Sequence, residues 1–154
     1  MTFDLDRFKR AQERDFAHAL AELHGGRKRS HWIWYIFPQL AGLGRSPIAQ
    51  TYGLQGLDEA TAYLRDPLLR ERLVAAADAV REHVHHDPPV ALRTLMGSEI
   101  DVLKLVSSMT LFHEVARRAG DDELASVADE ILQAAKTQGF DECEYTQRNL
   151  GRAF

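Results

Sequence analysis

Apolar residues recur three, four or five positions apart over much of this chain, which is the spacing of one buried helix face. Between Phe3 and His24 the pattern predicts a first helix, which Gly25 and Gly26 end. The charged residues of this helix, Glu22 among them, lie mostly off the apolar face and are expected to be solvated. The same spacing predicts further helices over Leu57–Leu64, Asp66–Val84 and Asp121–Lys136, and a last packed turn in the tail Asp141–Phe154.

Two shorter segments carry helix-capping signals. From Ser30 to Pro38 helical spacing and strict alternation both fit, but Ser30 suits an N-cap and Pro38 a stop. A short, nearly buried helix is therefore favoured there over a strand. Ser46-Pro47 has the signature of another helix start, and that helix runs towards Gly53. We predict an all-α fold, a compact multi-helical single domain over residues 1–154.

The segment Ser98–Phe112 combines a helical apolar surface with a narrow polar stripe. At 3.6 residues per turn, Asp101, Lys104, Ser107 and Ser108 fall on one wedge and apolar residues cover the opposing arc. A helix that is apolar nearly all round is expected in the core, where a carboxylate beside a lysine needs a partner or a function. Ser98 and Asp101 also have the spacing of a capping box, so a purely structural role for the acid stays open.

Composition limits the classes of partner. The 154 residues are 45% hydrophobic and 27% charged, which is typical of a globular protein, and the net charge of −4 disfavours general binding to nucleic acid or to membrane surfaces. A single cysteine, Cys143, allows no internal disulfide, and no apolar run reaches the length of a membrane span. We expect a soluble, cytoplasmic protein. The histidines near residue 85 have no partner at metal-ligand spacing, so neither a metal site nor a cofactor is expected.

The stretch Gly26–Gln39 departs most from average composition. Three consecutive cations, Arg27 to Arg29, precede four aromatic residues within six positions, and a glycine-rich turn containing Arg45 follows. Basic, aromatic and glycine-rich segments in succession suit an anionic ligand with a flat ring, such as a nucleotide. A buried aromatic hub with a solvated basic lip fits the same pattern.

Several stretches of the chain resemble a known bacterial family, called domain of unknown function 1810, whose members often carry the label calpastatin. The resemblance spans nearly the whole chain. A protease inhibitor that acts as an extended, disordered chain would not have this composition, so the label does not fit. The stretches that carry the resemblance are Arg7-Phe8 with Ala11-Gln12, Gly26–Gln39, Gly42–Gly44 with Ser46, and Lys104-Leu105 with Ser107–Phe112.

That family is in turn distantly similar to a mostly helical superfamily of N-glycosidases that act on NAD- and ADP-ribose-related molecules. The resemblance implies a carboxylate that stabilises positive charge on a sugar or activates water. Asp101 is the first candidate and Glu99 the second, because the family's acidic segment does not fix which one corresponds. The other candidates are His31 for the leaving group, Trp32 or Trp34 as a surface for the base, Arg27, Lys28 and Arg45 for phosphate, and Lys104 and Ser108 to order the carboxylate.

The enzyme hypothesis competes with a small module that binds a nucleotide or a protein without turnover. An enzyme requires Asp101 to share a pocket with Trp34 and the cations, whereas a binding module requires only the ring and the cations. A third hypothesis, a helical partner-binding protein, predicts a broad exposed apolar patch. We predict that the aromatic block and the Ser98–Phe112 helix lie side by side with a cleft between them. The sequence does not indicate an oligomeric state.

Overall fold

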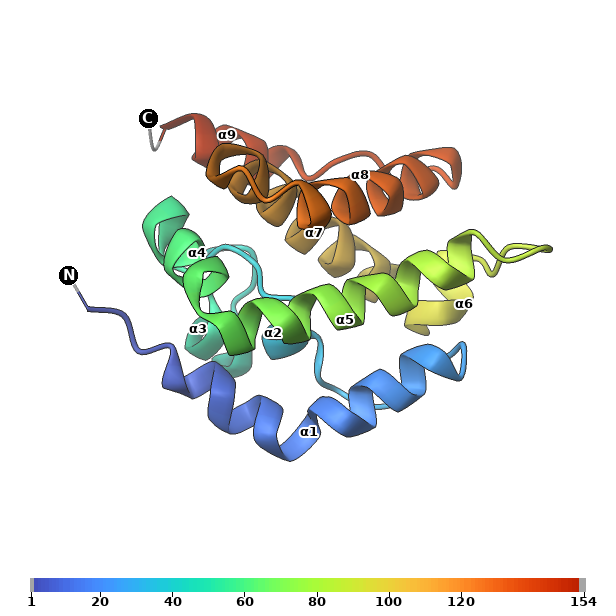
Figure 1. Ribbon diagram of the computed structural model, residues 1–154, viewed down its shortest axis with the longest axis horizontal. Helices are drawn as coiled ribbons and strands as arrows, with labels where there is room; N and C mark the ends of the chain where they lie inside the picture. The colour runs from blue at the N-terminus through green and yellow to red at the C-terminus, as the bar shows by residue number, and fades with distance from the viewer. Residues whose placement is uncertain (1, 153–154) are drawn as a thin grey trace.

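The computed structural model describes residues 2–152, and helices make up most of that part of the chain (Figure 1). The prediction of an all-α fold is confirmed. Within residues 2–152 the one extended pairing is an isolated parallel bridge between Leu40 and Leu54. The helices are α1 (Asp6–His24), α2 (Ile33–Ile36), α3 (Pro47–Tyr52), α4 (Gly56–Arg65), α5 (Pro67–Val84), α6 (Leu92–Met96), α7 (Glu99–Ala119), α8 (Asp122–Thr137) and α9 (Glu144–Arg152).

Side-chain caps lie at the predicted starts of α3, α5 and α7. The Ser46 hydroxyl accepts from the Ala49 N–H at α3, and the Ser98 hydroxyl accepts from the Asp101 N–H at α7. At α5, the Asp66 carboxylate accepts from two backbone N–H groups and Pro67 occupies the first helical position. Such caps satisfy backbone donors that have no partner inside the helix.

Three features differ from the expected pattern. Ser30 does not cap α2, which begins only at Ile33 after Trp32. The tail forms a helix of nine residues, α9, rather than a single turn, and residues 153 and 154 lie outside the described part. The five-residue helix α6 was not predicted, because a segment so short shows no repeated period.

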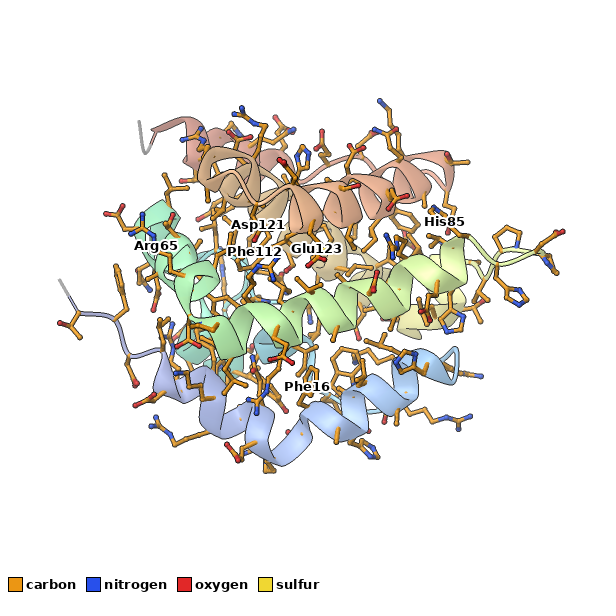
Figure 2. All side chains as sticks on the ribbon, viewed as in Figure 1. Phe16, Arg65, His85, Phe112, Asp121 and Glu123 are labelled. Carbon is orange, nitrogen blue, oxygen red and sulfur yellow. The ribbon has the colours of Figure 1, made fainter. Side chains whose placement is uncertain are left out.

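Helix α5 crosses the middle of the molecule, with α1 on one side and α8 on the other (Figure 1). Helix α7 packs against α4, α6, α8 and α9, and the buried apolar residues form one core cluster. Figure 2 places Asp121 and Glu123 in the space between α8 and α5, where Arg70 of α5 donates to both carboxylates at 2.7 and 3.1 Å. Among residues 2–152, no helix has the combined length and apolarity that crossing a bilayer requires.

Candidate functional site

The aromatic block forms part of the core, as predicted for a nearly buried helix. All four residues of α2 are buried, and Trp32, which precedes them, is 1% exposed. The ring of Trp32 lies 6.3 Å from that of Phe37. Trp32 is therefore a core residue and does not offer a surface to a ligand.

Glu22 of α1 holds the segment that leads into this block, and the expectation that it is solvated was wrong. Its side chain is 8% exposed. Its carboxylate accepts hydrogen bonds from the backbone N–H groups of Arg29 and Ser30, from the Ser30 hydroxyl and from the Trp32 indole. These bonds explain why Ser30 does not cap α2.

The environment of Glu22 shifts its titration strongly. Burial alone would raise the pKa of Glu22, but the hydrogen bonds from Ser30, Arg29 and Trp32 outweigh it and hold the pKa at about 2. The carboxylate is therefore ionised at neutral pH. A charged acceptor shared by four donors fixes the backbone of residues 29–32 more firmly than a neutral acceptor would.

Lys28 and Asp101 form a largely buried ion pair between this segment and the first turn of α7. Lys28 Nζ lies 2.8 Å from Asp101 Oδ2, and their side chains are 5% and 17% exposed. The same ammonium donates to the Ser30 carbonyl at 2.5 Å and lies 4.9 Å from the centre of the Trp32 ring. The Ser30 carbonyl and the Trp32 ring hold the Lys28 ammonium in place, and the ammonium in turn orients the Asp101 carboxylate.

Lys104, one turn further along α7, is the more accessible cation. Its Nζ lies 3.7 Å from Asp101 Oδ1 and 5.4 Å from the centre of the Trp34 ring, and its side chain is 30% exposed. An ammonium in this position has donors left for a ligand.

A cleft of about 150 Å³ opens between α7 and the aromatic block, as the sequence predicted. Its two lysines and one aspartate contribute a net charge of +1. The lining residues are Lys28, His31, Ile33, Trp34, Ser46, Ile48, Asp101 and Lys104.

The glycine-rich turn supports the wall of this cleft. A Cβ atom on Gly44 would lie 2.9 Å from the Trp34 ring and 2.8 Å from the Ala49 side chain, closer than packing allows. Trp34 therefore has the turn against its ring on one side and Lys104 near the ring, and it is 6% exposed. It forms a wall of the cleft and presents little open ring surface.

The remaining sequence candidates lie outside the cleft. Glu99 is 62% exposed and pairs with Arg93 at 3.3 Å, so Asp101 is the carboxylate that faces the cavity. Arg27 and Arg45 are exposed, and neither lines the cleft. Ser108 is fully buried, and its hydroxyl has no hydrogen-bond partner within residues 2–152.

Three lining residues were not among the predicted site residues: Ile33, Ser46 and Ile48. Ser46 was recognised only as a cap, and its place next to a glycine-rich turn was the available signal. Ile48 is exposed on the short helix α3 although it is large and apolar. An apolar residue in such a position gives no sequence signal for a site, because isolated exposed apolar residues are common.

A larger hollow of about 240 Å³ lies on α7 and the C-terminal segment, away from both tryptophans. Its residues include His113, Glu114 and Glu142. Hydrogen bonds from Arg117 hold the pKa of Glu114 at about 2 against the effect of burial, and Arg118 adds to them. This carboxylate is held by two guanidinium groups, and no tryptophan lines the hollow, so the smaller cleft that joins Asp101 to Trp34 is the better candidate site despite its size.

Comparisons with known proteins place the chain in a family. The family model described as "Protein of unknown function (DUF1810)" matches residues 2–140. A solved structure, the crystal structure of the conserved hypothetical protein Rv1873 from Mycobacterium tuberculosis, is similar over 97% of each chain, with 36% sequence identity and a TM-score of 0.79. No curated protein sequence matches the chain.

Proposed function

This chain belongs to the DUF1810 family of proteins of unknown function, and from its cleft we propose that it hydrolyses an N-glycosidic bond in a nucleotide- or ADP-ribose-related molecule. One observation carries the proposal: Asp101 shares a cavity with Trp34, His31 and two lysines. That combination is the one an enzyme requires, since a binding module has no need of the carboxylate.

The proposed reaction assigns each group a distinct task. As the bond between the sugar C1′ and nitrogen breaks, positive charge develops on the sugar ring, and the Asp101 carboxylate stabilises it or activates the attacking water. His31, at the exposed rim, transfers a proton to the leaving nitrogen, which is a common task of histidine near neutral pH. Lys104 binds a hydroxyl or phosphate oxygen of the substrate.

Lys28 acts as a positioning residue in this scheme. Its ion pair with Oδ2 fixes one oxygen of Asp101, so the other oxygen, Oδ1, which Lys104 Nζ approaches only to 3.7 Å, is left for the substrate or water. Because Trp34 is largely covered, the sugar rather than the base occupies the cleft, with Trp34 as an apolar wall beside it. A fixed carboxylate lowers the reorganisation that the reaction needs.

The test compares Asp101→Asn with Glu99→Gln on ADP-ribosyl and amino-sugar pyrimidine substrates, with release of the free base as the readout. Loss of a carboxylate that acts on the substrate lowers the rate by about 100-fold or more, because general acid–base groups contribute about 10²–10⁴-fold. Glu99→Gln, which changes an exposed carboxylate outside the cleft, retains the wild-type rate within about twofold. Thermal unfolding of both variants controls for folding.

No base release by the wild-type protein across the panel would contradict the proposal, and so would equal rates for wild type and Asp101→Asn. The second candidate is a module that binds the same ligands without turnover. It is favoured by the close ion pair of Asp101 with Lys28, which would equally serve to hold the segment before α2 against the first turn of α7. Calorimetric binding of ADP-ribose without turnover would support this candidate.

A further inference from the structure

Exposed aliphatic side chains lie next to the cleft. Within residues 2–152 four large apolar side chains are exposed: Ile48, Leu68, Ile100 and Leu103. Ile48 lines the cleft itself, and Ile100 and Leu103 each precede a cleft residue on the first two turns of α7. At about 100° per residue, Ile100 lies about 40° from Lys104 around the helix, and Leu103 lies about 60° beyond Ile100, on the side away from Lys104 and Asp101. Ile48 and Ile100 therefore adjoin this cleft, and Leu103 continues the exposed aliphatic surface outward from Ile100.

The cleft is too small to hold a whole nucleotide-sized ligand. Its volume is about 150 Å³, whereas pockets for drug-sized ligands measure about 300–1,000 Å³. Only a sugar-sized part can enter, and the rest of the ligand must lie across the rim. A rim ligand with aliphatic groups would cover Ile48, Ile100 and Leu103, which are 38%, 65% and 49% exposed.

Charge narrows the choice of rim ligand. The guanidinium groups of Arg27, Arg29 and Arg45 have no ion-pair or hydrogen-bond partner among the residues that the structure describes. In the sequence, Arg27 and Arg29 flank Lys28, and Arg45 precedes Ser46; both Lys28 and Ser46 line the cleft. Unpaired cations beside an aliphatic surface complement an acidic segment with aliphatic side chains. A nucleic acid fits less well, because the rim offers aliphatic rather than open aromatic groups.

We infer that the substrate is carried on a polypeptide: an acidic segment with aliphatic side chains docks on Ile48, Ile100 and Leu103 and presents a glycosylated or ADP-ribosylated side-chain nitrogen to the cleft. This inference rests on the proposed function. In the reaction, water adds its oxygen to C1′, the C1′–N bond breaks, and the side-chain nitrogen leaves with a proton. Water is the only co-reactant.

The experiment compares three substrates with the same ADP-ribosyl group: free ADP-ribosyl arginine, the same arginine in a nonapeptide with leucine and glutamate neighbours, and an ADP-ribosylated oligonucleotide. We expect kcat/KM for the peptide to exceed that for the free amino acid at least tenfold. The double variant Ile100→Ser/Leu103→Ser removes that advantage and leaves the rate on the free amino acid within twofold. Leu68→Ser, the matched control on α5, changes neither rate.

The outcomes separate failure of the peptide-substrate inference from failure of the proposed function. Equal kcat/KM on the free and peptide-borne substrates, or a higher value for the oligonucleotide, would overturn the inference and leave the proposed function standing. If none of the three is hydrolysed, the proposed function fails for ADP-ribosyl substrates, and calorimetric titration of the wild-type protein with the first two conjugates decides the inference. Peptide binding at least tenfold tighter than that of the free amino acid, and weakened by the double variant, supports the inference. Equal or undetectable binding overturns it.

Discussion

At the scale of single residues, hydrogen bonding separates side chains that the sequence pattern treats alike. Glu22 lies off the apolar face of α1 by periodicity, yet it is the acceptor that fixes residues 29–32. Ser108 lies on the same polar stripe as Asp101, yet its hydroxyl is buried without a partner in the described chain. Periodicity locates a residue on a helix face but does not say which distant groups meet it.

Glu22→Gln is expected to destabilise the protein by about 2–3 kcal/mol at pH 7, since hydrogen bonds to a charged group are worth about 1.5–3 kcal/mol each and the amide retains part of them. The pKa of Glu22 is lowered from 4.5 to about 2 in the folded state. Its contribution is therefore fully present above pH 4.5 and is lost as the pH falls towards 2. Urea unfolding at pH 7 and pH 3 should show that the difference in unfolding free energy between wild type and Glu22→Gln is smaller at pH 3.

Glu13→Gln provides the control for Glu22, because Glu13 is exposed on the same helix. Its effect on the free energy of unfolding should stay within about 0.5 kcal/mol at either pH. If Glu22→Gln behaved like Glu13→Gln, the acceptor role of Glu22 would be refuted.

Ser108→Ala should leave the protein as stable as wild type or more stable by up to about 1 kcal/mol, because it removes a buried hydroxyl that has no partner. Thr110→Val is the contrasting variant. The Thr110 hydroxyl donates to the Val106 carbonyl and accepts from the Cys143 N–H, so its loss should cost about 1–2 kcal/mol. Thermal unfolding measures the stability of both variants. A clear loss of stability in Ser108→Ala would show that the Ser108 hydroxyl does have a hydrogen-bond partner.

At the scale of elements, local signals predicted most helices and missed those that depend on tertiary contacts. The starts of α3, α5 and α7 follow from Ser46, Asp66 and Ser98, because a cap acts within its own turn. Ser30 is also a serine at a predicted helix start, but its hydroxyl donates to Glu22 instead of capping, and α2 begins only at Ile33. The short helix α6 is stabilised by burial of Leu92, Leu95 and Met96 rather than by a repeating pattern.

The junction of α6 and α7 gives a prediction at this scale. Gly97 and Gly120 both end helices with positive φ, at +83° and +74°. A Cβ atom on Gly97 would lie 3.0 Å from the Lys28 carbonyl oxygen, whereas one on Gly120 would meet nothing within 4 Å. Gly120→Ala should cost about 1–2 kcal/mol for its backbone conformation. Gly97→Ala should cost about 1 kcal/mol more, since it also crowds the segment that carries Lys28.

Chemical denaturation of the two glycine variants measures this difference directly. An equal loss of unfolding free energy in both variants would contradict the prediction. It would show that Gly97 is required only for its positive φ and that the Lys28 backbone can move to accommodate a Cβ atom.

At the scale of the whole molecule, the cleft exists because the Lys28–Trp34 segment is packed against the first turns of α7. The sequence predicted that these two segments lie side by side. Its candidate site residues include five that line the cleft: Lys28, His31, Trp34, Asp101 and Lys104. It could not separate Asp101 from Glu99, since both lie in the same first turn, and only the position of Lys28 distinguishes them. The aliphatic rim was not predicted as part of the site, because its residues carry no catalytic chemistry.

The two tryptophans allow the most direct test of the central claim, which is that this cleft is where the ligand binds. In ¹H–¹⁵N spectra the indole N–H signals of Trp32 and Trp34 can be assigned with Trp34→Phe, and ADP-ribose can then be titrated. We predict that the Trp34 signal and the backbone signals of Asp101 and Lys104 shift, while the signal of the Trp32 indole, which is hydrogen-bonded to Glu22, does not. Shifts confined to the hollow around His113, or no shift at Trp34, would contradict it.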